Sequence, residues 1–116
     1  MDFMNCTWSP ENEAHVYFRV ADYTPVQVSD FHEIINEIRT RASGLVIKFD
    51  LKGAGPKTRE EFRSLFKLIC DVIDYTKGDG LLRKVYIIGA GFLFRFLYGP
   101  LSLLIPREIR DLILFS

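Results

Sequence analysis

The side chains that most often carry catalysis are scattered in this sequence. His15 falls on an expected strand, and His32 with Glu33 fits the solvated face of an expected helix. The chain has neither the nucleophile elbow of a hydrolase nor the H-E-x-x-H pair of a metalloprotease. Asp50 ends an expected strand, where sites in α/β proteins often lie, but a single acid without partners more often organises a loop. We expect no catalytic residue and predict that the protein is not an enzyme.

The glycines and cysteines form no cofactor or metal motif. Gly89-Ala90-Gly91 follows an expected strand, but the third glycine of a dinucleotide fingerprint would fall on Phe94. Residues 53–58 lack the spacing of a phosphate-binding loop. Cys6 and Cys70 fit neither a disulfide framework nor a metal site, and Cys70 lies on the apolar stripe of an expected helix. We therefore expect no cofactor and no metal.

Composition limits the remaining classes of function. The 116 residues are 48% hydrophobic and 14% aromatic, which suits one domain with a real core. The formal net charge is zero, so the electrostatic footprint of a nucleic-acid-binding protein is missing. Residues 81–116 nevertheless carry five bases and two acids, an excess of 5 − 2 = +3. This excess indicates either an anionic surface as partner or ordinary solvated charges.

The start of the chain is polar and acidic, unlike a signal peptide, so we expect a cytoplasmic location.

The expected elements alternate between strands and helices. Residues 15–21 alternate apolar and polar side chains, as in a strand with one buried face. Thr58 and Glu61 form a capping box ahead of an apolar helical stripe. The expected order is β-α-β-α-β-α-α-β, which predicts one α/β domain over residues 1–116, with a mostly parallel sheet flanked by helices. Residues 1–12 are expected to be a loose N-terminal segment. The other strands are expected at 45–51, 84–88 and 112–115.

One segment, Phe92 to Ile105, is apolar on nearly every side. Its fourteen residues are too few to span a bilayer, which needs about 20. It fits a buried helix that covers the sheet, and it equally fits a mobile element that covers a cavity and meets a membrane when it opens. Gly99-Pro100 favours a break or hinge, because proline removes a helix hydrogen bond.

Three motifs in order resemble the Sec14-like (CRAL-TRIO) lipid-binding family. Residues 49–53 (FDLKG) are similar to the DLKG strand end of that family, and residues 15–18 (HVYF) are similar to its early P-V-Y-F strand. Residues 84–115 resemble its K-x-Y-I-I-N strand, Phe-rich gate helix and closing strand. The resemblance covers residues 13–116. It implies a lid helix over a hydrophobic pocket that takes a phospholipid or similar molecule and opens at the membrane.

The resemblance also implies a set of site residues. It places Phe92, Phe94, Phe96, Leu97, Leu101 and Leu104 in the lid, and it suggests that Ile47, Phe49, Tyr86 and Ile88 of the sheet face the pocket. For an anionic surface or lipid headgroup we expect Arg83, Lys84, Arg95 and Arg107.

Departures from the family pattern keep a second function open. The Tyr-Pro-Glu of the family falls on Gly78-Asp79-Gly80, and the Lys of its K-P-F-L turn falls on Ser102, so we do not expect phosphatidylinositol exchange. The leading prediction is non-enzymatic binding of a lipid or other hydrophobic molecule, with peripheral membrane contact. The alternative is a protein-interaction module with a small-GTPase-type partner or a STAS-like regulatory role, or a homodimer formed through the same apolar helix.

Overall fold

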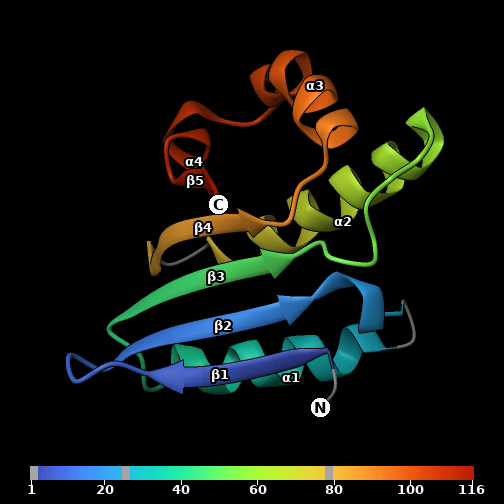
Figure 1. Ribbon diagram of the computed structural model, residues 1–116. Helices are drawn as coiled ribbons and strands as arrows, with labels where there is room; N and C mark the ends of the chain where they lie inside the picture. Colours follow the sequence, from blue (N-terminus) through green and yellow to red (C-terminus); the bar gives the residue numbers. More distant parts are fainter. Residues whose placement is uncertain (1–2, 25–26, 78–79) are drawn as a thin grey trace.

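Five strands form one sheet in the order β1-β2-β3-β4-β5, with β1 antiparallel to β2 and all other neighbours parallel (Figure 1). This computed structural model describes residues 3–24, 27–77 and 80–116. The strands are β1 (Met4–Trp8), β2 (Glu13–Arg19), β3 (Gly44–Asp50), β4 (Leu82–Ile88) and β5 (Ile113–Phe115). The helices are η1 (Val20–Asp22), α1 (Val28–Arg39), α2 (Arg59–Thr76), α3 (Phe92–Leu101), η3 (Ser102–Leu104) and α4 (Arg107–Arg110). The predicted α/β class with a mostly parallel sheet is confirmed.

The N-terminal segment differs from the prediction, because residues 4–8 form a strand where we expected a loose chain. β1 pairs with β2 along its whole length, from Met4 opposite Phe18 to Trp8 opposite Ala14. Met4 and Cys6 turn toward the helices, whereas Asn5 and Thr7 are exposed. A two-residue alternation is therefore present in this segment, and pairing with β2 satisfies its backbone groups.

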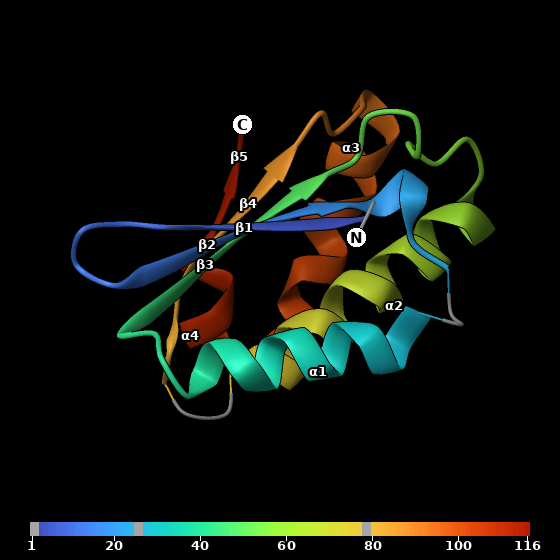
Figure 2. The ribbon, with the colours of Figure 1, turned by 90° about the horizontal axis from the view of Figure 1, so that it is seen from below.

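All the helices lie on one side of the sheet, as Figure 2 shows. Consecutive parallel strands are neighbours here, so right-handed crossovers through α1, α2 and α3 must all pass over the same face. The alternation within the strands agrees: Leu45, Ile47 and Phe49 of β3 are buried beneath the helices. None of the described helices lies on the opposite face of the sheet, which we call the helix-free face.

The helix ends follow local chemistry. The Thr58 side chain accepts a hydrogen bond from the Glu61 N–H at 3.1 Å, which confirms the predicted cap of α2. α3 contains Gly99 and Pro100 in its last turn and continues after Leu101 as the 3-10 turn η3. The predicted break at Gly99-Pro100 is therefore wrong, and the helical course ends at Ile105, whose backbone is extended. Gly78 and Asp79, which we compared with the family's Tyr-Pro-Glu, lie outside the described residues.

The core is formed between the sheet and the helices. Aromatic rings in contact run through it, with the ring centroid of Phe18 of β2 at 5.5 Å from that of Phe49 of β3 and at 5.9 Å from that of Phe31 of α1. Phe62 of α2 continues this layer toward α3. Edge-to-face and tilted contacts of this kind add to the burial of the rings themselves.

Candidate functional site

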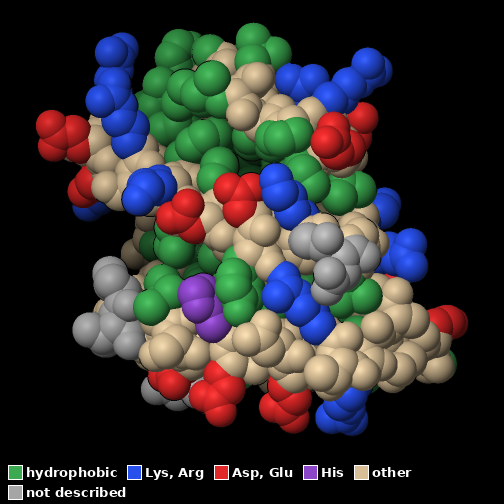
Figure 3. All heavy atoms as spheres, turned by 180° about the vertical axis from the view of Figure 1, so that it is seen from behind, with side chains coloured by type: hydrophobic (Ala, Val, Ile, Leu, Met, Phe, Trp, Pro, Cys, Tyr) green, Lys and Arg blue, Asp and Glu red, His purple; other side chains and the backbone are tan. Residues whose placement is uncertain are grey.

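The Phe-rich segment forms an exposed apolar ridge, made of Phe92, Phe96, Leu103 and Leu104 on α3 and η3. These four side chains are 85%, 65%, 75% and 75% exposed. The rings of Phe92 and Phe96 lie nearly parallel, with centroids 6.1 Å apart. Figure 3 shows the helix side of the molecule, with hydrophobic side chains gathered over its upper end. Four large apolar side chains exposed to water along α3 and η3 indicate a surface that contacts another apolar body.

The other face of α3 packs against α2 and β5. Phe94 is fully buried, and its ring lies 5.0 Å from Phe62 of α2. Tyr98, one turn later, lies 5.0 Å from Phe115 of β5. Leu97 and Leu101 are half-buried against the core. The predicted lid residues therefore divide into an inward set (Phe94, Leu97 and Leu101) and an outward set (Phe92, Phe96 and Leu104).

A small hollow lies where the ridge meets α2. It holds about 80 Å³ and is lined by Cys70, Ile73, Asp74, Leu104, Ile105, Pro106 and Ile109. Small-molecule pockets usually hold roughly 300–1,000 Å³. A lipid cannot enter this hollow as it stands, and to lie under α3 it would have to displace the contacts of Phe94 and Tyr98.

The four predicted pocket residues of the sheet point to opposite faces. Ile47 and Phe49 are 1% and 0% exposed, within the core under the helices. Tyr86 pairs with Lys48, and Ile88 pairs with Asp50, so both lie on the helix-free face. These four residues cannot line one pocket, because neighbours in a strand alternate between the two faces of a sheet.

The helix-free face contains a hollow of about 500 Å³, lined by Glu13, His15, Val46, Lys48, Arg83, Lys84, Tyr86, Ile88 and Ser116. Four of our predicted residues, Tyr86, Ile88, Arg83 and Lys84, come together here. Sequence reasoning missed Lys48 and His15. The sequence does contain a signal for Lys48, because it is the one basic residue within the apolar run 45–51.

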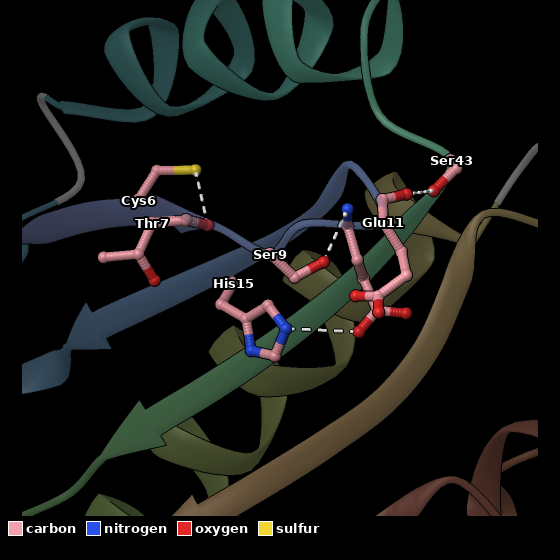
Figure 4. Close-up of polar contacts among 7 residues, drawn as sticks. Cys6, Thr7, Ser9, Glu11, His15 and Ser43 are labelled. Atoms are coloured by element: carbon pink, nitrogen blue, oxygen red, sulfur yellow. Dashed lines mark hydrogen bonds and ion pairs between the residues drawn. The ribbon is translucent and has the colours of Figure 1, made fainter.

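Polar contacts fix the edges of this face. Figure 4 shows the His15 ring directed at a neighbouring carboxylate, that of Glu13, with Nε2 and Oε1 3.1 Å apart. At the other end of β2, the Tyr17 hydroxyl donates to Asp50 Oδ2, and the Lys52 N–H donates to Asp50 Oδ1 at 2.9 Å. Asp50 therefore organises the loop that follows β3.

These contacts shift two pKa values. Burial alone would raise the pKa of Asp50, but the hydrogen bonds from Tyr17 and Lys52 and nearby positive charge outweigh it, so its pKa lies below the ordinary range. The hydrogen bond to Asp50 in turn raises the pKa of Tyr17.

The four basic residues predicted to meet an anionic surface lie in two different parts of the molecule. Arg83 and Lys84 belong to the helix-free face. Arg95 lies over the Phe115 ring, with its guanidinium carbon 5.3 Å from the centroid, and Arg107 is 4.0 Å from Asp111. The segment from α3 to β5 thus has three bases and two acids, an excess of 3 − 2 = +1.

Within the described ranges, no three His, Cys, Asp or Glu side chains group closely enough to hold a metal ion. Nor do the described helices include one long and apolar enough to cross a membrane.

Comparisons with known proteins support the fold. No family model matches the chain, and a search of curated protein sequences also finds no match. The crystal structure of Sfh5, a Sec14 homologue, is similar, with a TM-score of 0.65 and 11% identity over 98% of this chain. The chain spans about half of that protein, 48% of its length. At this identity the likeness shows the fold alone, and that fold is Sec14-like.

Proposed function

We propose that this protein binds a lipid or other hydrophobic molecule without catalysing a reaction on it, and that its exposed apolar ridge contacts a membrane surface. The observation that carries the proposal is the exposure of Phe92, Phe96, Leu103 and Leu104 on one side of a helix whose other side is buried. The Sec14-like fold agrees with this function, since the family resemblance implies a gate helix at the same place.

The hydrophobic effect makes this contact favourable. Full burial of a Phe or Leu side chain contributes about 1.5–3 kcal/mol. Inserting even part of Phe92 and Phe96 into an interface therefore gives measurable affinity. The charge of the ridge contributes little, because a basic residue near an anionic leaflet is worth about 1 kcal/mol and the local excess is +1.

Opening of α3 would give an apolar molecule access to the core. The inward residues Phe94 and Tyr98 hold the helix through ring contacts with Phe62 and Phe115. A membrane that receives the ridge would pull the helix away from these rings and expose an apolar slot between α2 and β5. Binding at the surface and uptake into the slot are then two steps made by the same segment.

Vesicle flotation tests the first step. Phe92→Asp and Phe96→Asp should each reduce the bound fraction at least about tenfold, since each removes apolar area worth more than 1.4 kcal/mol. Val28→Asp is the matched control, because Val28 is 44% exposed on α1 and receives the same charge. Binding should depend only weakly on the fraction of anionic lipid. Parent protein that stays unbound on neutral and anionic vesicles alike would end the proposal.

Mass spectrometry of an organic extract tests the second step. Protein purified without detergent should carry an apolar passenger, and the passenger should be lost after Phe94→Asp, which puts a charge into the buried ring cluster. Extracts that contain no passenger would restrict the function to surface contact.

The second candidate function is docking to another protein chain. The same ridge favours it, because the stacked rings of Phe92 and Phe96 present an exposed aromatic pair of the kind that protein interfaces bury. Light scattering on a size-exclusion column distinguishes the two. A dimer that dissociates in Phe96→Asp, together with no vesicle binding, would favour docking.

A further inference from the structure

The helix-free face of the sheet carries a positively charged hollow that lies apart from the apolar ridge. Its floor is apolar, with Val46 only 5% exposed and Ile88 half-buried. Among the described side chains that line it, Lys48, Arg83 and Lys84 are cationic and Glu13 alone is acidic, a side-chain excess of 3 − 1 = +2. Its volume of about 500 Å³ falls in the range of small-molecule sites.

The strand register brings two lysines and a tyrosine together. Lys48 of β3 lies opposite Tyr86 of β4, and Val46 lies opposite Lys84. Lys48 and Lys84 are therefore diagonal neighbours on one face. With strands about 4.8 Å apart and a rise of about 3.3 Å per residue, their Cα atoms lie roughly 8 Å apart. Two lysine side chains that start this far apart can reach one anion placed above Val46.

The two lysines are uncompensated. Across the residues that the structure describes, the side chain of neither Lys48 nor Lys84 has an ion-pair or hydrogen-bond partner. The Glu13 carboxylate is directed to His15, and Arg83 donates to the Ser43 carbonyl at 3.2 Å. Both ammonium groups are therefore available to an anion that enters the hollow.

We propose that this hollow binds a small organic anion, with its charged group between Lys48 and Lys84 and a flat apolar body against Tyr86, Val46 and Ile88. Phosphate esters and aryl carboxylates belong to this class. The ammonium groups would donate charge-assisted hydrogen bonds to the anion, and the Tyr86 ring would cover one face of the body. The site goes beyond the lipid contact proposed above and uses the opposite face of the molecule.

Titration with phenyl phosphate, followed by amide chemical shifts in NMR spectra, tests the site. We expect saturable shifts confined to the parts of β2, β3 and β4 that line the hollow, weaker binding of inorganic phosphate, and no binding of benzyl alcohol. Lys48→Met and Lys84→Met should each weaken the binding of phenyl phosphate at least about tenfold, because each removes one hydrogen bond to a charged group. Lys67→Met on α2 is the matched control and should leave the affinity unchanged.

A second variant distinguishes the contribution of the ligand's apolar body from that of its charged group. Tyr86→Ala should weaken the binding of phenyl phosphate severalfold and leave the binding of inorganic phosphate unchanged. Urea unfolding of each variant shows whether it is folded.

Several outcomes would overturn the proposal. They are unsaturable shifts spread over all surface lysines, unchanged affinity in Lys48→Met, equal loss of both anions in Tyr86→Ala, and a parent dimer that Lys48→Met dissociates. The vesicle assay distinguishes a lipid headgroup from a soluble anion, since Lys48→Met should leave vesicle binding intact. If phenyl phosphate does not bind, and Phe92→Asp still abolishes vesicle binding, this inference is refuted and the proposed lipid contact stands.

Discussion

The sharpest test of the α3 arrangement compares two phenylalanines, Phe92 and Phe94, on the same helix. Phe94 is 0% exposed and contacts the rings of Phe62 and Phe115, whereas Phe92 is 85% exposed. Replacing each by alanine removes the same atoms from the same element. The difference in unfolding free energy therefore reports which side of the helix is packed.

The magnitude follows from burial. Truncation of a buried Phe to Ala typically costs about 3–5 kcal/mol, because apolar burial is lost and a cavity remains. Truncation of an exposed Phe changes stability by at most about 0.5 kcal/mol. For a urea slope of about 1–3 kcal/mol per molar, Phe94→Ala should lower the unfolding midpoint by roughly 2 M, and Phe92→Ala should hardly move it.

The assay is urea unfolding followed by circular dichroism and tryptophan fluorescence, with slopes compared to show that both variants unfold alike. A Phe94→Ala cost below about 1 kcal/mol would refute the packed arrangement and show that α3 is detached in solution. A Phe92→Ala cost equal to that of Phe94→Ala would show that the helix is rotated about its axis. Either result would require a new account of the exposed apolar ridge.

Two further predictions follow from the pKa shifts. The Asp50 carboxylate should titrate below the ordinary range in carbon NMR, and Tyr17→Phe should raise its pKa, because the variant removes a hydrogen bond to the charged form. The stability that Asp50 contributes is then present at neutral pH and lost as pH falls through the lowered pKa; an unchanged pKa in the variant would contradict this account. Burial, with Asp74 and Asp71 adding to it, raises the pKa of Cys70 to about 11, so at pH 8 iodoacetamide should modify Cys70 far more slowly in folded than in urea-unfolded protein. Equal rates by mass spectrometry would show that the thiol is not protected.

Local patterns predicted the elements well. The alternation of His15 to Arg19, the capping box at Thr58 and the apolar stripe of α2 are each decided by residues within a few positions of one another. These signals predicted the strands, the helices and the parallel sheet. β1 was missed, because a five-residue edge strand depends on pairing with β2 more than on its own composition. The predicted strand 15–21 also ran too far, since β2 ends at Arg19 and residues 20–22 form η1.

Local patterns could not predict which side chains share a surface. The run 44–50 is apolar at nearly every position, so its alternation cannot be read from residue types, and Ile47 and Lys48 point to opposite faces for reasons that register alone decides. The charge excess at residues 81–116 appeared as one feature in the sequence, yet the fold divides it between the helix-free face and the ridge.

The order and periodicity of the residues were enough to predict the class of fold and an apolar, Phe-rich segment after β4. Which phenylalanines of that segment are buried was decided only by tertiary structure. A helix that is apolar on all sides has no preferred inward face until a neighbour covers one, and here α2 and β5 cover Phe94 and leave Phe92 and Phe96 in water.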